Sequence, residues 1–184
     1  MAAVVVGTLA APRDPELDRV LGAGAAQRLR GEMAARARRW AAAAAPGRAF
    51  EATTLGAAEA ALAGHEGPVL LAAPDVPGLD HRVVRDALDD LAAGCDVVVG
   101  AAHDARPYLI AVARPNPELL ELVDASFGSG VLAAAAERGL VLGILRSERR
   151  LASPADARAL ALDPQAPADL IALVRDGLDG PPGR

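Results

Sequence analysis

The sequence contains no lysine, one cysteine and only four aromatic residues among its 184 positions. Without lysine, the chain has no side-chain amine for a Schiff base, and any cationic phosphate contact falls to arginine. The single cysteine, Cys95, excludes a disulfide framework and a cysteine-rich zinc site. Cys95 begins an apolar run, where a buried structural thiol is the usual interpretation.

Long apolar runs and a basic charge balance are missing as well. No apolar stretch approaches the roughly 18 residues that a membrane-spanning helix needs, so we expect no membrane span. The formal net charge is −5, and so few aromatic side chains provide no platform for base stacking, which argues against a nucleic-acid partner. The first residues lack the basic region of a signal peptide, and we expect a cytoplasmic, bacterial protein.

The remaining composition is that of an ordinary globular protein, with 52% hydrophobic and 23% charged residues. This length fits one domain, which we place at residues 1–179, followed by a Gly/Pro-rich flexible tail at 180–184. Short apolar runs typical of buried strands alternate with helical stretches, which predicts a three-layer α/β sandwich with a mostly parallel sheet. The predicted strands are residues 3–8, 49–54, 68–73, 96–100, 108–113 and 140–145.

Helices are expected between most of these strands. The longest covers 24–45, where Leu29, Met33, Ala37 and Trp40 share one face and arginines occupy much of the rest, as on a solvated face. The polar, proline-containing segment 12–18 is expected to be a loop. Alanine-rich helix faces are compatible with a homodimer. The other predicted helices are residues 55–63, 81–93, 117–123, 130–138, 153–162 and 169–178. Ser153 is the expected N-cap of the helix at 153–162.

Asp75 is the sharpest candidate for chemistry. It follows the predicted strand 68–73 and is held between two prolines in the segment Pro74-Asp75-Val76-Pro77-Gly78-Leu79. Ligands of open α/β sheets bind at the carboxyl ends of strands, and a carboxylate fixed there can hold a divalent cation that neutralises a diphosphate. Alternatively, Asp75 caps its turn by accepting hydrogen bonds from nearby backbone N–H groups.

A second polar segment, His103 to Pro107, connects two predicted strands and therefore also lies at a sheet end. Asp104 is suited to a metal ion or a sugar hydroxyl, and Arg106 is suited to a phosphate. The alternative is a polar strand connection without a ligand.

Three segments resemble, in order and spacing, a small bacterial family of uncharacterised proteins with the glycosyltransferase A-type (GT-A) fold of the nucleotide-diphospho-sugar transferases. Residues 74–79 are similar to the family's Ser/Thr-Asp-Ile/Val-Pro-Gly-Leu. Residues 103–111 are similar to Ala-Asp-Gly-Gly-Tyr-Tyr-Leu-Ile-Gly, and residues 150–157 correspond to Asp-Val-Asp-Thr-Pro-Glu-Asp-Leu.

This resemblance implies a Rossmann-like α/β/α sandwich and a nucleotide-activated sugar or a nucleotide as the bound partner, with Mg²⁺ or Mn²⁺ as cofactor. It implies that Asp75 holds the metal ion and that Asp75 and Asp104 are the catalytic residues. The remaining implied site residues are Arg13, Arg19 and Arg106 at the phosphates, and Pro77, Gly78 and Tyr108 at the acceptor or its loop.

The sequence departs from the family pattern at three places. The first loop, residues 10–21, has three acidic residues and none of the family's lysines. Ala105-Arg106 stands in place of the family's Gly-Gly pair. Ala152 stands in place of the second Asp of the family's late segment. Acidic groups in the first loop would repel a diphosphate, and loss of an Asp removes a metal ligand. Three functions stay open: a metal-dependent glycosyltransferase-like protein, a GT-A-like binding or regulatory module without catalysis, and a nucleotidyltransferase of the same superfamily.

Overall fold

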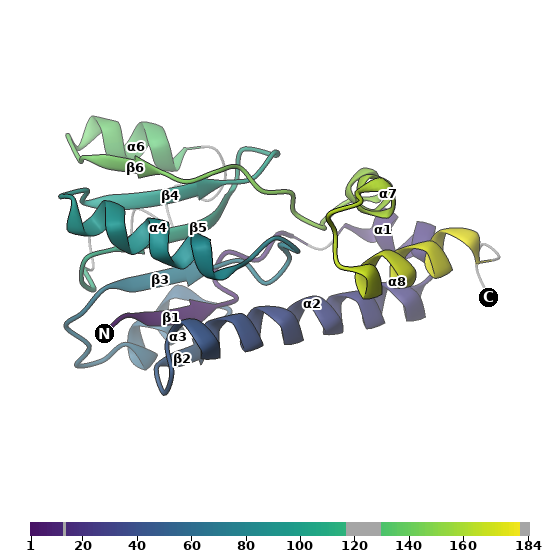
Figure 1. Cartoon of the computed structure of the whole chain (residues 1–184), viewed down its shortest axis with the longest axis horizontal. Helices are drawn as coiled ribbons and strands as arrows, with labels where there is room; N and C mark the ends of the chain where they lie inside the picture. The colour runs from purple at the N-terminus through teal and green to yellow at the C-terminus, as the bar shows by residue number, and fades with distance from the viewer. Residues whose placement is uncertain (13, 117–129, 181–184) are drawn as a thin grey trace.

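The computed structural model describes residues 1–12, 14–116 and 130–180. Its centre is a six-stranded sheet in the order β2-β1-β3-β5-β4-β6 (Figure 1). The strands are β1 (Ala3–Val6), β2 (Ala49–Glu51), β3 (Val69–Ala72), β4 (Val97–Ala101), β5 (Pro107–Val112) and β6 (Leu142–Ile144). All six predicted strands are thus confirmed; four are shorter than predicted, β4 is shifted by one residue towards the C-terminus and β5 by one residue towards the N-terminus.

The sheet is mostly parallel, as predicted, and β5 is the strand that runs against the others. It pairs antiparallel with both β3 and β4, whereas β1 pairs parallel with β2 and β3, and β4 pairs parallel with β6. The reason is the short connection between β4 and β5, because a parallel connection needs a crossover of about a dozen residues or more.

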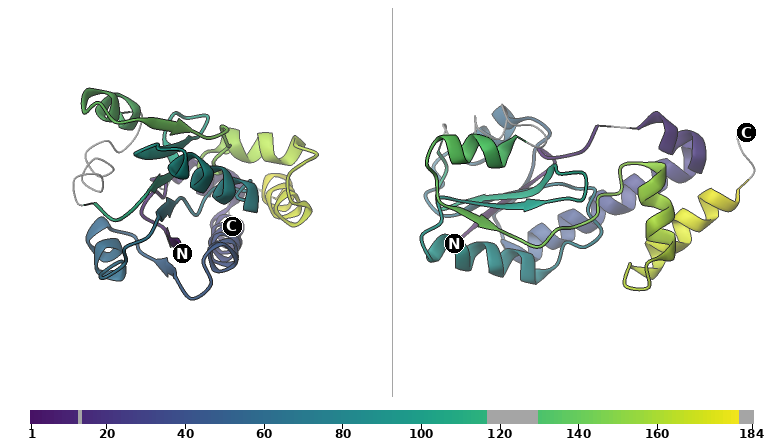
Figure 2. Two further views of the ribbon diagram at one scale, coloured as in Figure 1. Left: turned by 60° about the vertical axis from the view of Figure 1, so that its left-hand side comes forward. Right: turned by 90° about the horizontal axis from the view of Figure 1, so that it is seen from above.

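Helices cover both faces of this sheet. Figure 2 shows α2 and α4 on one face and α3 and α6 on the other, which confirms the three-layer sandwich. These helices are α2 (Ala23–Ala44), α3 (Leu55–Ala61), α4 (His81–Ala92) and α6 (Val131–Glu137). The predicted helix 117–123 lies outside the described residues. No helix in the described part of the chain is long and apolar enough to cross a membrane.

Beyond the carboxyl ends of the strands lie three further helices, α1 (Pro15–Leu21), α7 (Pro154–Leu162) and α8 (Ala168–Asp179) (Figure 1). Of these, α1 and α8 pack on the first half of α2, and α7 packs on α1 and α8. Leu29 and Met33 of α2 belong to the apolar cluster of these helices, whereas Ala37 and Ala41 belong to the core of the sheet. The long helix therefore joins two apolar clusters, and the carboxyl edge of the sheet faces the space between them.

The prediction of a loop at 12–18 is wrong, since α1 begins at Pro15. Asp14 is its N-cap and accepts a hydrogen bond from Glu16 N at 2.8 Å, and Pro15 stands in the first turn. An Asp followed by Pro is a helix start signal, because proline lacks the N–H that a first-turn residue would leave unpaired. Ser153 and Pro154 begin α7 in the same way, and here the N-cap was predicted.

Candidate functional site

Three hollows follow one another along the carboxyl edge of the sheet. The first hollow, about 350 Å³, is lined by Val6, Gly7, Ala34, Arg38, Glu51, Ala52, Thr53, Ala57 and Pro74. The middle hollow, about 240 Å³, is lined by Ala10, Leu17, Leu29, Arg30, Met33, Ala34, Pro74, Asp75 and Leu151. The third hollow, about 480 Å³, is lined by Ala11, Pro12, Asp14, His103, Asp104, Arg106, Ala152, Ser153 and Asp156. The first and middle hollows share Ala34 and Pro74, and the middle and third are lined by consecutive residues at 10–11 and 151–152, so the three hollows are neighbours along this edge.

Each hollow is bordered by one arginine: Arg38 at the first, Arg30 at the middle and Arg106 at the third. Their side chains are 49%, 38% and 37% exposed. Arg38 Nε lies 3.5 Å from Glu51 Oε1, Arg106 Nε lies 3.9 Å from Asp104 Oδ2, and Arg30 pairs with Asp18. The pairs of Arg38 and Arg106 are exposed on both sides, and exposed ion pairs contribute only about 0–1 kcal/mol, so an incoming phosphate can compete for these two guanidinium groups.

Asp104 shapes the turn between β4 and β5. Its Oδ1 accepts a hydrogen bond from Arg106 N at 3.1 Å, and Ala105 N donates to Ala102 O at 2.9 Å. Ala105 has a φ of +63°, a conformation that favours glycine, and it stands where the resembling family has a Gly-Gly pair. The turn is kept despite the substitution, and the exposed carboxylate of Asp104 borders the third hollow beside Arg106.

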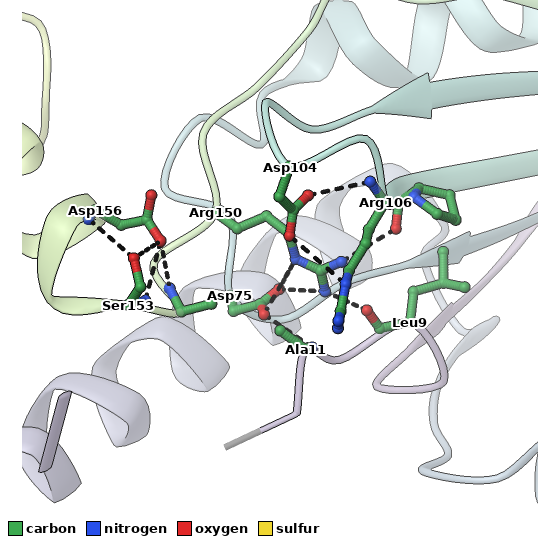
Figure 3. A network of polar contacts seen from close by, with 10 residues as sticks. Leu9, Ala11, Asp75, Asp104, Arg106, Arg150, Ser153 and Asp156 are labelled. Carbon is green, nitrogen blue, oxygen red and sulfur yellow. Dashed lines mark hydrogen bonds and ion pairs between the residues drawn. The ribbon is translucent and has the colours of Figure 1, made fainter. Parts of the chain in front are cut away.

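Asp75, in the loop after β3, forms an ion pair with Arg150 (Figure 3). Arg150 Nη2 lies 2.9 Å from Asp75 Oδ1, and Arg150 Nε lies 3.2 and 3.3 Å from the two carboxylate oxygens. Ala11 N donates to Asp75 Oδ2 at 3.0 Å. The turn-capping alternative for Asp75 is not confirmed, because the backbone N–H that donates to its carboxylate belongs to Ala11, in a distant loop.

Arg150 is the one buried charged side chain within the described residues, and it is 4% exposed. Besides Asp75, it donates to Leu9 O after β1 and to Pro107 O at the start of β5, the latter at 3.3 Å. Leu151 N donates to Asp75 O at 2.7 Å. Arg150 therefore ties together three loops at the carboxyl edge.

A divalent cation does not fit these residues. Both oxygens of Asp75 accept hydrogen bonds, and the guanidinium that donates most of them would repel a second cation. Across residues 1–12, 14–116 and 130–180, no group of three or more His, Cys, Asp or Glu side chains is arranged to hold a metal ion. The metal-holding role that the resemblance implies for Asp75 is therefore at odds with its surroundings.

The other acids of the third hollow already hold local structure. Asp14 caps α1, and Asp156 forms a capping box with Ser153 at the start of α7. Ser153 Oγ lies 2.7 Å from Asp156 Oδ2, and Asp156 N donates to Ser153 Oγ at 3.2 Å. These contacts engage the carboxylates that a metal ion would otherwise recruit.

Of the other predicted phosphate ligands, Arg13 lies outside the described residues. Arg19 is exposed on α1 and pairs with Glu16. Its hydrogen bond lowers the pKa of the Glu16 carboxyl. Arg106 is the predicted phosphate ligand that the structure places at the candidate site.

Pro77 and Gly78 line a fourth hollow, of about 570 Å³, which is a different hollow from that of Asp104. There, Arg146 Nε lies 2.7 Å from Glu148 Oε1, and Arg146 Nη2 lies 3.1 Å from Asp80 Oδ2 and donates to Gly78 O at 3.2 Å. A Cβ on Gly78 would come within 2.2 Å of Glu148 Oε2. Gly78 therefore allows a close approach of the Glu148 carboxylate to the loop after β3.

The place predicted for Tyr108 needs correction, because its side chain is buried in the core of the sheet. Its hydroxyl donates to Arg146 O at 2.9 Å, and burial raises the pKa of its phenol. The ring packs directly against the Cα of Gly100, where a Cβ would come within 2.5 Å of the ring. Tyr108 thus supports the loop that carries Arg146 and is closed to an acceptor.

Asp80 provides a pH-dependent prediction for this loop. Partial burial acts to raise the pKa of the Asp80 carboxyl, but hydrogen bonds from Val83 N, Arg146 and Arg82 N outweigh it, and the net shift is downward. A lowered pKa in the folded state stabilises the fold above the unfolded value, about 3.9, and this contribution is lost as pH falls through the folded value.

We therefore expect Asp80→Asn to have a lower Tm than the parent protein at pH 7 and a Tm gap that closes as the pH falls below about 4. Asparagine remains a good N-cap for α4, so the helix start is kept. Asp89→Asn, exposed on the same helix, controls for the loss of one negative charge. Thermal unfolding at several pH values tests this; a gap that is constant or widens in acid contradicts it.

Three basic residues of the site were not predicted from the sequence. Arg30 and Arg38 were assigned to a solvated helix face, and only the path of α2 past the sheet edge places them at hollows. Arg150 had a detectable signal, because it stands where the family's late segment has its first Asp. A basic residue in place of one of the family's acids indicates an ion pair with an acid that this sequence keeps, which here is Asp75.

A family model described as an uncharacterized protein conserved in bacteria (DUF2064) matches residues 8–127, well over half of the chain. No curated protein matches the sequence. Among solved structures, a protein from Desulfovibrio desulfuricans G20, provisionally assigned as a nucleotide-diphospho-sugar transferase, superposes with a TM-score of 0.70. The match covers 95% of this chain and 94% of that protein at 17% identity, which shows a shared fold.

Two other solved structures share less of the geometry. Rv0371C from Mycobacterium tuberculosis H37Rv, in complex with manganese, has a TM-score of 0.47 at 17% identity, over 86% of this chain and 96% of its own. Molybdopterin-guanine dinucleotide biosynthesis protein A from Archaeoglobus fulgidus has a TM-score of 0.44 at 12% identity, with the same coverage.

Proposed function

Since the matched family model spans most of the chain, the protein belongs to the DUF2064 family, and we propose that it binds a nucleoside-diphosphate sugar or a related nucleotide. The binding site would be the row of hollows at the carboxyl edge of the sheet. The observation that carries this proposal is the succession of three neighbouring hollows, each bordered by an arginine. The fold shared with the Desulfovibrio protein supports the same class of ligand.

The three hollows differ in the chemistry that they offer. The first and middle hollows are both lined mostly by apolar residues. The first is also lined by Gly7, Thr53 and Glu51, and it suits the face of a nucleobase. Arg30 and Arg106 border the middle and third hollows, where the diphosphate would lie. His103 and Asp104 border the third hollow and suit the hydroxyl groups of a sugar.

Glycosyl transfer is a second proposal, supported by the exposed Asp104 carboxylate at the far end of the row. Asp104 would orient an acceptor hydroxyl there. Binding without catalysis is supported by the engagement of Asp75, Asp14 and Asp156 in structural contacts. Release of nucleoside diphosphate from a bound donor, measured with and without candidate acceptors, separates these two proposals.

The binding proposal predicts that one member of a panel of nucleoside diphosphates and nucleotide-sugars raises Tm by several degrees. A ligand at 100 times its Kd stabilises the native state by about 2.7 kcal/mol, and about 2–4 °C per kcal/mol is expected at this size. Arg106→Ala should weaken binding about tenfold, because a hydrogen bond to a charged group contributes about 1.5 kcal/mol or more. Isothermal titration gives the Kd values.

Arg39→Ala is the matched control for this experiment. Arg39 is exposed on α2 and pairs with Glu32 at 2.7 Å, so its loss removes the same charge outside the three hollows. Equal affinities for the two variants would contradict the place proposed for the phosphates. A folded sample that no panel member stabilises would contradict nucleotide binding itself.

A further inference from the structure

We infer that Arg150 takes the place of a divalent cation at Asp75, so that this protein binds its nucleotide without a metal ion. The part about the nucleotide rests on the proposed function, whereas the part about Asp75 rests on the ion pair alone. The inference starts from a disagreement: the resemblance implies Mg²⁺ or Mn²⁺ at Asp75, and the structure has a buried guanidinium there.

The contacts of Asp75 leave its negative charge compensated from within the chain. Oδ1 accepts from Arg150 Nη2 at 2.9 Å and Nε at 3.2 Å, and Oδ2 accepts from Arg150 Nε at 3.3 Å and Ala11 N at 3.0 Å. Carboxylate and guanidinium are matched in shape and charge. A divalent cation at either oxygen would have to displace these donors or lie beside a fixed positive charge.

The charge count of the late segment supports the same inference. Arg150 stands where the family segment has an acid. Replacing a negative side chain by a positive one changes the charge of the site by +2, which equals the charge of a divalent cation. Ala152 stands where the family has a second acid. Asp75 is thus left with a counter-charge and without the neighbouring carboxylates that hold Mg²⁺ or Mn²⁺ in proteins.

Because Arg150 is buried, its positive charge stays beside Asp75. Arg150 is 4% exposed and also donates to Leu9 O and Pro107 O, so it cannot leave for solvent as a bound ion can. Its contacts hold the loop that carries Ala10 and Ala11, which line the middle and third hollows. Arg150 is therefore a positioning residue, because it orders the ligand-binding edge without reaching the ligand.

The first test measures Mn²⁺ binding to the protein alone, by the electron paramagnetic resonance signal of free Mn²⁺. The parent protein should bind no Mn²⁺ at Asp75 at millimolar concentrations, and its nucleotide Kd should be the same with Mn²⁺ and with EDTA. Mn²⁺ binding that Asp75→Asn abolishes would overturn the inference. So would a nucleotide Kd that EDTA weakens about tenfold or more.

The second test restores the two acids of the family segment with Arg150→Asp/Ala152→Asp. This double variant should bind Mn²⁺, and its Tm should rise when Mn²⁺ is added, whereas the Tm of the parent protein should not. Arg114→Asp, at an exposed position after β5, is the control for the same change of charge. A folded double variant that gains no Mn²⁺ binding would overturn the role of Arg150.

The two tests separate this inference from the proposed function. Mn²⁺ binding is measured without nucleotide, so a protein that binds neither Mn²⁺ nor any nucleotide contradicts the proposed function and leaves the Asp75–Arg150 assignment supported. If the double variant does not fold, the Mn²⁺ titrations of the parent protein and of Asp75→Asn still decide the question.

Discussion

Replacing Arg150 by alanine should lower the free energy of unfolding by about 3–5 kcal/mol, because the Asp75 carboxylate then loses its buried counter-charge. The carbonyl groups of Leu9 and Pro107 also lose a donor. At about 2–4 °C per kcal/mol, Tm should fall by roughly 6–20 °C. Urea or thermal unfolding followed by circular dichroism measures the change.

Arg149→Ala is the matched control, since Arg149 is the preceding residue and its side chain is 40% exposed. It pairs with Asp156 at a distance of 3.6 Å. Loss of an exposed pair should cost about 0–1 kcal/mol. Similar losses for the two variants would show that the buried pair does not stabilise the carboxyl edge in the way described.

A double-mutant cycle sharpens this prediction. Asp75→Ala/Arg150→Ala removes both charges, so its loss of stability should be smaller than the sum of the two single losses. Additive losses would contradict direct coupling between the two side chains.

Replacing Gly7 by alanine should cost about 2–4 kcal/mol, through backbone strain and steric overlap. Gly7 has a φ of +119°, and a Cβ there would lie 2.6 Å from the backbone oxygen of Ala52. Neither partner can move easily, because Gly7 N donates to Ala72 O and Ala52 N donates to Val6 O, both at 3.0 Å. Chemical unfolding of the variant gives the loss of stability.

Gly31→Ala is the matched control for the glycine prediction. Gly31 lies inside α2, is exposed, and a Cβ there would have nothing within 4 Å. Alanine at a helix interior is favoured over glycine by about 0.5–1 kcal/mol, so this variant should be more stable than the parent protein. The same chemical change should therefore have opposite signs at the two positions, and a neutral Gly7→Ala would contradict the described close approach.

The sequence predicted the layers well because strand and helix patterns are local. The valines of β1 and the run at β3 lie in the core of the sheet, and Leu29, Met33 and Ala37 share the buried face of α2. Ser153 and Pro154 were recognised as a helix start. The helix α1 was missed because the two prolines and the charges of residues 12–18 were interpreted as a loop, although Asp14-Pro15 carries the same start signal.

The sequence predicted at which end of the strands the candidate site lies, but it predicted only some of the contacts between the residues there. The loops after β3 and β4 do lie at the carboxyl edge, because the direction of a strand places the residues that follow it. The same reasoning could not tell that Pro77 and Gly78 border a hollow different from that of Asp104. That division depends on the segment 148–151, which bonds to both loops: His103 N donates to Glu148 O, and Leu151 N donates to Asp75 O.

By itself, the sequence determined the alternation of strands and helices, the family, and the acids that follow the strands, because each depends on residues close together in the chain. Only the tertiary structure decided which charge compensates which. Asp75 and Arg150 are 75 positions apart, and their attraction becomes large only when folding brings them within about 3 Å with the guanidinium buried. That pairing decides whether Asp75 has room for a metal ion, and no local pattern contains it.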